Sequence, residues 1–206
     1  IHPPTTIPQM PEYGGLGGPM PRFPEVSSSV QAMPDGVFSK VAHRIAAIEG
    51  ERFPLHVGDT WMEPAEGCRM EDFAVDVNPG MHTYTLPKGH PVLVNAIADV
   101  RTVEPERVIV TAGAAGALGA LSCALVSPGD EVLILSPFWP LIRGIVLLHH
   151  GVPVEVPVLG MEDPKQVAQA ILERMSSRTV AIYVNTPNNP TGRLIPRGVL
   201  EAIRDV

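Results

Sequence analysis

The chain has 206 residues, of which 15 are basic and 22 acidic, so its formal net charge is −7. This acidic balance disfavours a nucleic-acid or anionic-membrane partner, because both need clustered Lys and Arg. Hydrophobic residues make up 45% and charged residues 18%, which excludes a disordered chain. No window approaches the roughly 20 apolar residues of a membrane span. The two cysteines, Cys68 and Cys123, lack metal-ligand spacing, so we expect a cytoplasmic protein with free thiols.

The first part of the chain predicts little regular structure. Proline and glycine crowd residues 1–34, which predicts either an extended arm that wraps a partner surface or a flexible tail. Apolar residues at three- and four-residue steps predict an amphipathic helix over 38–50. A short extended piece is expected at 53–58 and an irregular segment at 59–90. A short helix is then expected at 91–100.

From Glu106 onward, short apolar runs alternate with helical periodicity. The expected strands are 108–110, 131–135, 152–158 and 179–184, and the expected helices are 114–126, 137–149, 164–175 and 196–206. Successive strand–helix units predict an α/β domain with a mainly parallel sheet and helices on both faces. Ligands of such sheets bind beyond the carboxyl ends of the strands.

Three of these strand ends carry unusual residues. The small residues at 111–116 and the helix start behind them predict a phosphate site, although tight strand–helix packing explains small residues equally well. Phe138 and Trp139 offer either a flat face for a planar ring or ordinary core packing. The loop 185–192, Asn-Thr-Pro-Asn-Asn-Pro-Thr-Gly, is stiffened by prolines and favours a positioned Asn carboxamide. Together they predict a flat, phosphorylated, heteroaromatic ligand.

These segments resemble the class I and II aminotransferases, the pyridoxal-phosphate family of fold type I. The matching segments are 55–58, Tyr84 with Gly89 and Pro91, 108–113, 128–132, 136–140 and 185–192. The resemblance runs from about residue 38 to the last residue and corresponds to the N-terminal half of that family. It implies an arm and small-domain segment at 1–57 and part of a large cofactor-binding domain at 58–206, whose C-terminal remainder is absent.

The resemblance implies pyridoxal 5′-phosphate as the cofactor. Gly113, Ala114 and Ala115 would cup its phosphate through backbone amides. Relatives often carry a hydroxyl or a longer polar side chain where Ala115 stands, so that contact is missing here. Trp139 would stack on the pyridine ring, and Asn189 would bond the phenolic oxygen and contact the substrate.

The resemblance also implies a homodimer. Tyr84 would reach the phosphate held by the neighbouring subunit, and Gly58 would lie beside the substrate carboxylate. The Schiff-base lysine, an Asp at the ring nitrogen and an Arg for the substrate carboxylate all lie downstream of the loop in the family. The three lysines of this chain, Lys40, Lys88 and Lys165, lack that context and are expected on the surface. The catalytic residues are therefore unassigned, no metal is expected, and this chain by itself is expected to be inactive.

The leading interpretation is an enzyme that moves an amino group between an α-amino acid and a 2-oxo acid. A carbon–sulfur lyase and an aminocyclopropane-carboxylate-synthase-like enzyme share these motifs and remain alternatives, as does a non-catalytic domain of the same fold. A nucleotide-binding Rossmann domain is disfavoured, because residues 111–116 do not form a G-x-G-x-x-G pattern and the expected downstream acid is wrong.

Overall fold

The computed structural model describes residues 24–33, 37–51, 58 and 62–206. Most of the expected arm and of the extended piece at 53–58 lies outside these residues. The first described elements are the helices α1 (Ser28–Gln31) and α2 (Val37–Ala46). The sequence reading missed α1, whose cap is Ser27: its hydroxyl accepts a hydrogen bond from the amide of Val30 at 3.4 Å. The expected helix at 38–50 is present as α2 but ends earlier, at Ala46.

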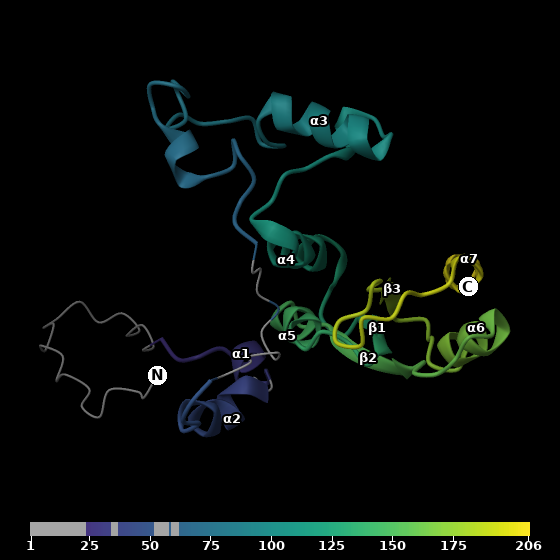
Figure 1. Ribbon diagram of the computed structural model, residues 1–206. Coiled ribbons are helices and arrows are strands. Elements are labelled where there is room, and N and C mark those ends of the chain that lie inside the picture. Colours follow the sequence, from purple (N-terminus) through teal and green to yellow (C-terminus); the bar gives the residue numbers. More distant parts are fainter. Residues whose placement is uncertain (1–23, 34–36, 52–57, 59–61) are drawn as a thin grey trace, which may run out of the picture.

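The next described segment, 62–110, extends away from the sheet and carries α3 (Pro91–Arg101) (Figure 1). Apart from the short 3-10 helix η1 (Met70–Phe73), residues 62–90 contain no helix or strand, as predicted. A second 3-10 helix, η2 (Pro105–Arg107), follows α3. The prediction of a strand at 108–110 was wrong. Val108 packs against α3 instead of joining the sheet, and the Val110 amide donates to the Lys88 carbonyl at 2.8 Å.

The sheet of the described chain has three parallel strands: β1 (Glu131–Ser136), β2 (Val152–Pro157) and β3 (Thr179–Tyr183). Their order is β2-β1-β3, so β1 lies in the centre. Residues 131–135 of β1 are all buried. The apolar run at 132–135 is expected in a sheet covered on both faces, whereas Glu131 is a buried charged residue. The register runs from Glu131 opposite Val152 to Ser136 opposite Pro157, and the pairing with β3 is irregular after Glu131.

Helices cover both faces of this sheet, which confirms the predicted α/β architecture. They are α4 (Gly113–Leu125), α5 (Leu141–Leu148), α6 (Pro164–Leu172) and α7 (Arg197–Arg204). Val132 and Ile134 of β1 face α5 and α4, whereas Leu133 and Leu135 face α6 and α7. The alternation follows from the two-residue period of a strand. Placing α5 and α6 on opposite faces is what right-handed crossovers require for this strand order.

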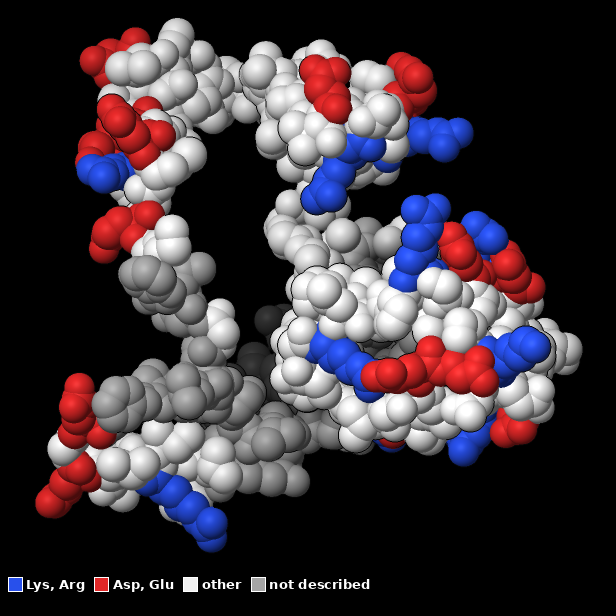
Figure 2. Space-filling view, turned by 45° about the vertical axis from the view of Figure 1, so that its right-hand side comes forward, with Lys and Arg blue, Asp and Glu red and all other residues white. Residues whose placement is uncertain are grey.

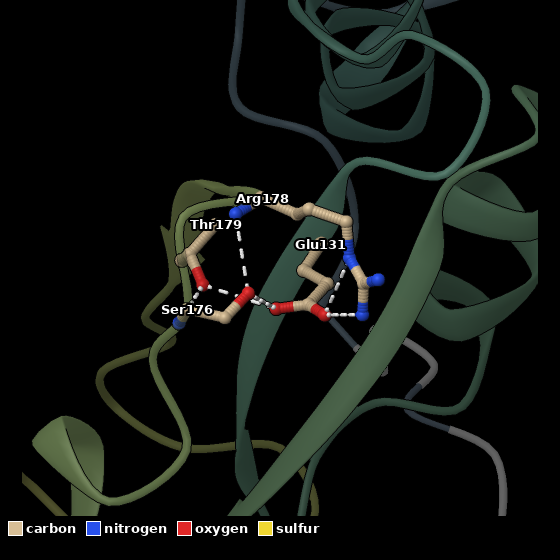
Figure 3. A network of polar contacts seen from close by, with 4 residues as sticks. All are labelled: Glu131, Ser176, Arg178 and Thr179. Atoms are coloured by element: carbon tan, nitrogen blue, oxygen red, sulfur yellow. Dashed lines mark hydrogen bonds and ion pairs between the residues drawn. The ribbon is translucent and has the colours of Figure 1, made fainter.

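A polar network joins the amino-terminal ends of β1 and β3 (Figure 3). The Glu131 carboxylate is buried and accepts hydrogen bonds from the Ser176 hydroxyl at 2.6 Å and the Thr179 hydroxyl at 3.3 Å. The Arg178 guanidinium donates to it through Nε at 3.1 Å and Nη2 at 2.5 Å. These donors, with the positive charge of Arg178, hold the pKa of Glu131 below its ordinary value. The network stabilises strand pairing at the sheet edge remote from the predicted ligand site.

Charged side chains of both signs are interspersed on the face of the molecule seen in Figure 2. Several arginines are paired with carboxylates, for example Arg143 with Glu155 at 2.5 Å and Arg197 with Glu201 at 2.8 Å. Such pairing reduces the positive potential that a polyanion would need. Of the helices that the structure describes, none has the length and hydropathy of a bilayer span.

Candidate functional site

The carboxyl ends of β1 and β3 lie side by side, because the two strands are parallel neighbours. The chain leaving β1 enters α5 on one face of the sheet, and the chain leaving β3 enters α7 on the other face (Figure 1). In open α/β sheets, ligands bind where neighbouring loops depart to opposite faces, and we call this position between the two loops the crevice. The bordering loops, 137–140 and 184–196, contain two of the three predicted strand-end segments.

Asn188 organises the loop after β3. Its backbone amide donates to the Arg193 carbonyl at 2.8 Å, and its carbonyl accepts from the Gly192 amide at 2.6 Å. Its side-chain Oδ1 accepts from the Thr191 hydroxyl at 2.8 Å and from the Thr191 amide at 3.3 Å. Its Nδ2 donates to the Pro137 carbonyl of the loop after β1 at 3.0 Å. One side chain therefore closes its own loop and ties it to the neighbouring one.

The carboxamide of Asn189 is exposed at this edge. The Asn189 backbone amide donates to Oδ1 of Asn185 at 2.8 Å, which fixes the main chain at this position. The hydrogen bond of Asn189 is made by its backbone, and its side chain has no partner among the described residues, so both its donor and its acceptor are open to a ligand. The predicted role of Asn189 toward a ring oxygen and the substrate stays a prediction, and the geometry leaves the required group available.

Trp139 is partly buried in the loop just before α5. It packs against the cluster on the α5 face of β1, and Phe138 packs against the same cluster. Both aromatic residues therefore take part in core packing, as one of the two interpretations expected. A stacking role for the exposed part of the Trp139 ring stays a prediction. Leu118 of α4 also contacts this cluster, which brings α4 close to the loop after β1. The cluster consists of Val132, Ile134, Ile142 and Val146.

The amino-terminal end of α4 carries the predicted phosphate cup. The helix begins at Gly113, whose φ of +69° is one that glycine adopts readily. Its cap residue, Ala112, has no side chain that could bond the first-turn amides. The first N–H groups of a helix have no partner within it and form a site for an anion. Gly113, Ala114 and Ala115 are all exposed here. The Gly113 amide donates to the Thr111 carbonyl at 2.9 Å, and the Thr111 hydroxyl donates to the Gly113 carbonyl at 3.0 Å, so the amides of Ala114 and Ala115 are the more open ones.

A cavity at the same sheet edge lies on the side of α6 and α7. Its empty volume is about 580 Å³, including solvent at its mouth. Apolar residues of β1, α6 and α7 form much of its wall, and Asn185, Asn188, Thr191 and Arg193 line it from the loop after β3. Neither Trp139 nor residues 113–115 line this cavity. A ligand that contacts those residues must therefore lie at the α4 and α5 side of the crevice.

The two predicted residues outside the sheet region are not brought to the crevice by this chain. The Tyr84 side chain is completely exposed, in the segment that extends away from the sheet. Gly58 is exposed too, and a Cβ placed on it would have no neighbour within 4 Å. Complete exposure of a tyrosine is compatible with a contact made in another subunit, which is the role that the resemblance implies for Tyr84.

None of the described lysines lies in the arrangement of a catalytic amine. Lys88 donates from Nζ to the Glu106 carbonyl at 2.9 Å, and Lys165 is exposed at the start of α6. The side chain of Lys40 lies outside the described part. Among the described residues, no cluster of ligands could hold a metal ion. Near the crevice, burial raises the pKa of Tyr183 at the end of β3, so its hydroxyl stays protonated to higher pH.

Sequence reasoning missed the contribution of Asn188. The prediction assigned a role to Asn189, whereas Asn188, the residue before it, makes the contact to Pro137 across 51 positions. Two adjacent asparagines were the available signal, because each carboxamide can donate and accept. The Glu131 network was missed as well, since its partners are separated by 45 to 48 positions along the chain.

Comparison with known proteins supports the family suggested by these strand ends. The sequence pattern of the family "Aminotransferase class I and II" matches residues 66–206. The probable aspartate/prephenate aminotransferase of Thermus aquaticus is 42% identical over 137 residues, covering 62% of this chain and 35% of that protein. Kynurenine–oxoglutarate transaminase 3 of Mus musculus is 35% identical over 146 residues, covering 61% of this chain and 31% of that protein.

Solved structures of such proteins share the fold. The aspartate aminotransferase from Thermus thermophilus with maleate matches with a TM-score of 0.74 and 34% identity, over 89% of this chain and 50% of that chain. The alanine aminotransferase from Pyrococcus furiosus matches with a TM-score of 0.74 and 27% identity, over 88% and 49%. The chain thus spans about a third of the length of the curated relatives and about half of the solved chains.

Proposed function

The chain belongs to the class I and II aminotransferase family, and we propose that the protein containing it is a pyridoxal 5′-phosphate-dependent aminotransferase. It transfers an amino group between an α-amino acid and a 2-oxo acid. The relatives reported above are named as aminotransferases or transaminases, which favours transfer over lyase chemistry. The observation that carries the proposal is the open carboxamide of Asn189, held at the carboxyl edge of a parallel sheet beside the loop of Trp139.

The described residues fit the cofactor from two sides. The uncapped first turn of α4, at Gly113, Ala114 and Ala115, would hold the phosphate through backbone N–H groups. Within the described part of the chain, those of Ala114 and Ala115 are free to do so, whereas the Gly113 amide also donates to the Thr111 carbonyl at 2.9 Å. Trp139 holds the ring by its exposed surface, and Asn189 donates a hydrogen bond to the ring oxygen, favouring its anionic form. When bound, the cofactor acts as an electron sink for the substrate α-carbon. Asn189 also contacts the substrate.

The remaining functional groups come from outside the crevice of this chain. Gly58 lies beside the substrate carboxylate in the complete site. Tyr84 contacts the phosphate in the neighbouring subunit of a homodimer, which explains a tyrosine fully exposed within its own chain. The lysine that holds the cofactor belongs to the half of the protein that this chain does not span.

Residues 1–57 form the arm and a small-domain segment, and residues 58–206 belong to the large domain. Two exposed free thiols, Cys68 and Cys123, suit a cytoplasmic location.

The test uses the full-length protein and its Asn189→Ala variant. The protein as purified should absorb between roughly 330 and 430 nm, with a band that shifts when an amino acid is added. The variant should lose one hydrogen bond to a charged oxygen, so kcat should fall by about 10- to 150-fold. Because the Asn189 side chain has no described partner, the free energy of unfolding should change by less than about 0.5 kcal/mol. Asn95→Ala, on an exposed face of α3, is the matched control and should leave kcat unchanged, while the better helix propensity of alanine raises the free energy of unfolding by roughly 0.5 kcal/mol.

Each outcome discriminates between functions. Amino transfer from aspartate or another amino acid to a 2-oxo acid supports the proposal. Release of ammonia and a 2-oxo acid without an amino acceptor would indicate a lyase. Failure of the full-length protein to bind pyridoxal 5′-phosphate would overturn the proposal and indicate a non-catalytic domain of this fold.

A further inference from the structure

Asn188 differs from its neighbour Asn189 in having every side-chain group engaged within the protein. Its Oδ1 accepts from Thr191, and its Nδ2 donates to the Pro137 carbonyl at 3.0 Å. The side chain is partly buried between the loops that follow β3 and β1. A hydrogen bond in such a place is shielded from competing water and is more effective than one on the open surface.

The two ends of this contact adjoin the two residues proposed to hold the cofactor ring. Asn188 directly precedes Asn189, and Pro137 lies two positions before Trp139. The main chain at Asn189 is fixed on its other side by Asn185, whose Oδ1 accepts from the Asn189 amide at 2.8 Å. Trp139 in turn packs against the core beside β1. The Asn188 side chain therefore makes a hydrogen bond that fixes the loop after β3 relative to the loop after β1.

We propose that Asn188 is a positioning residue that holds the loop of Asn189 at a set distance from the loop of Trp139. We call the hydrogen bond from Asn188 to Pro137 the tether. That the two loops hold the cofactor rests on the function proposed above, whereas the tether itself rests on the contacts of this chain. Only a carboxamide provides a donor toward Pro137 and an acceptor toward Thr191 on neighbouring atoms. Aspartate keeps the acceptor and loses the donor, and its charge faces the Pro137 carbonyl oxygen. Alanine removes both functions.

The tether predicts a loss of binding without a loss of any group that touches the cofactor. In Asn188→Ala, the loop of Asn189 is no longer held at one distance from Trp139, and binding must restore that arrangement. We expect the affinity for pyridoxal 5′-phosphate to fall by about 5- to 30-fold, the range for one to two lost hydrogen bonds. Asn188→Asp should fall in the same range, because it too lacks the donation to Pro137. Thr191→Ser keeps the hydroxyl that bonds Asn188 and should bind as tightly as the native protein.

A measurement on the cofactor-free protein separates the tether from the cofactor. The full-length protein is labelled with 5-fluorotryptophan, and the fluorine NMR signal of Trp139 is assigned with Trp139→Phe. Asn188→Ala and Asn188→Asp should shift or broaden this signal, whereas Thr191→Ser and the remote control Asn95→Ala should not. Asn188→Asp keeps the loop bonds to Thr191 and serves where Asn188→Ala yields no folded protein.

The outcomes are distinguishable. An unchanged Trp139 signal together with unchanged cofactor affinity in both Asn188 variants would overturn the tether. A changed signal with weakened affinity supports it. A changed signal in a protein that binds no cofactor, native sequence included, would support the tether and overturn the proposed function instead. Affinity that falls equally in the Asn95→Ala control would contradict a local role for Asn188.

Discussion

Gly89 lies two residues before α3 and packs closely against the side chain of Val110. Its φ is +116°, and a Cβ added there would lie 2.6 Å from Cγ2 and 2.7 Å from Cβ of Val110. The approach is fixed by the backbone, because the amide of Val110 donates to the carbonyl of Lys88 at 2.8 Å. Replacing Gly89 by alanine therefore imposes an unfavourable backbone conformation and a steric overlap at the same residue.

The two costs are of similar size. A side chain in this backbone region costs roughly 1–2 kcal/mol, and the overlap with Val110 adds roughly 1–3 kcal/mol. We expect Gly89→Ala to lower the free energy of unfolding by about 2–5 kcal/mol. Gly80→Ala isolates the backbone cost, since its φ is +87° and the nearest atom to its Cβ is Thr83 Oγ1 at 3.8 Å. Gly119→Ala meets no atom within 4 Å in α4 and should stabilise the helix by about 0.5–1 kcal/mol.

The assay is urea unfolding of the full-length protein, followed by circular dichroism. Val110→Gly introduced into Gly89→Ala removes both close atoms, Cβ and Cγ2, and should recover the steric part only, giving a coupling energy of about 1–2 kcal/mol. If Gly89→Ala costs no more than Gly80→Ala, or if the two substitutions at positions 89 and 110 are additive, the close approach does not hold this segment in place.

The other two predictions concern the sheet and its core. The pKa of Glu131 is held low by hydrogen bonds from Ser176 and Arg178 and by the Arg178 charge. Its carboxylate therefore stabilises the fold above the ordinary glutamate pKa of about 4.3 and loses this effect as the pH falls through the lower folded value. Urea unfolding of Glu131→Gln should show a deficit at neutral pH that shrinks in acid, and a deficit independent of pH would contradict the network. Ile171→Ala, at a fully buried position, should lower the free energy of unfolding by about 2–5 kcal/mol. Leu172→Ala, at a half-exposed position, should cost less than about 1 kcal/mol, and equal losses would argue against the packing of α6.

Most of the regular elements could be predicted from local patterns. The buried run of β1 and the apolar periodicity of α5 and α6 are local properties, and each element lies close to its predicted range. The prediction failed at 108–110, where three consecutive β-branched residues have strand propensity. Burial of Val108 against α3 outweighs that propensity, because strand propensity reflects side-chain packing more than the backbone. Short helices such as α1 are also difficult to predict, since one turn gives no periodicity.

The candidate site also has one part that could be predicted from the sequence and one that could not. The open carboxamide of Asn189 and the small residues at the start of α4 could be found by inspection, because helix starts and rigid asparagine loops follow strands in sequence. Which loops meet could not be found in this way. Strand order β2-β1-β3 places the end of β3 beside that of β1, and the bond from Asn188 to Pro137 exists only because of that order.

The sequence by itself determined an acidic α/β chain, the positions of its strands and helices after residue 112, and the chemistry available at the strand ends. Those properties depend on composition and on periodicities of two and 3.6 residues, which are local. Only the tertiary structure decided the strand order, the full exposure of Tyr84 and the partners of Asn188 and Glu131. These depend on contacts between residues far apart in the chain, and such contacts form only when the apolar faces of the helices are buried on the two sides of one sheet.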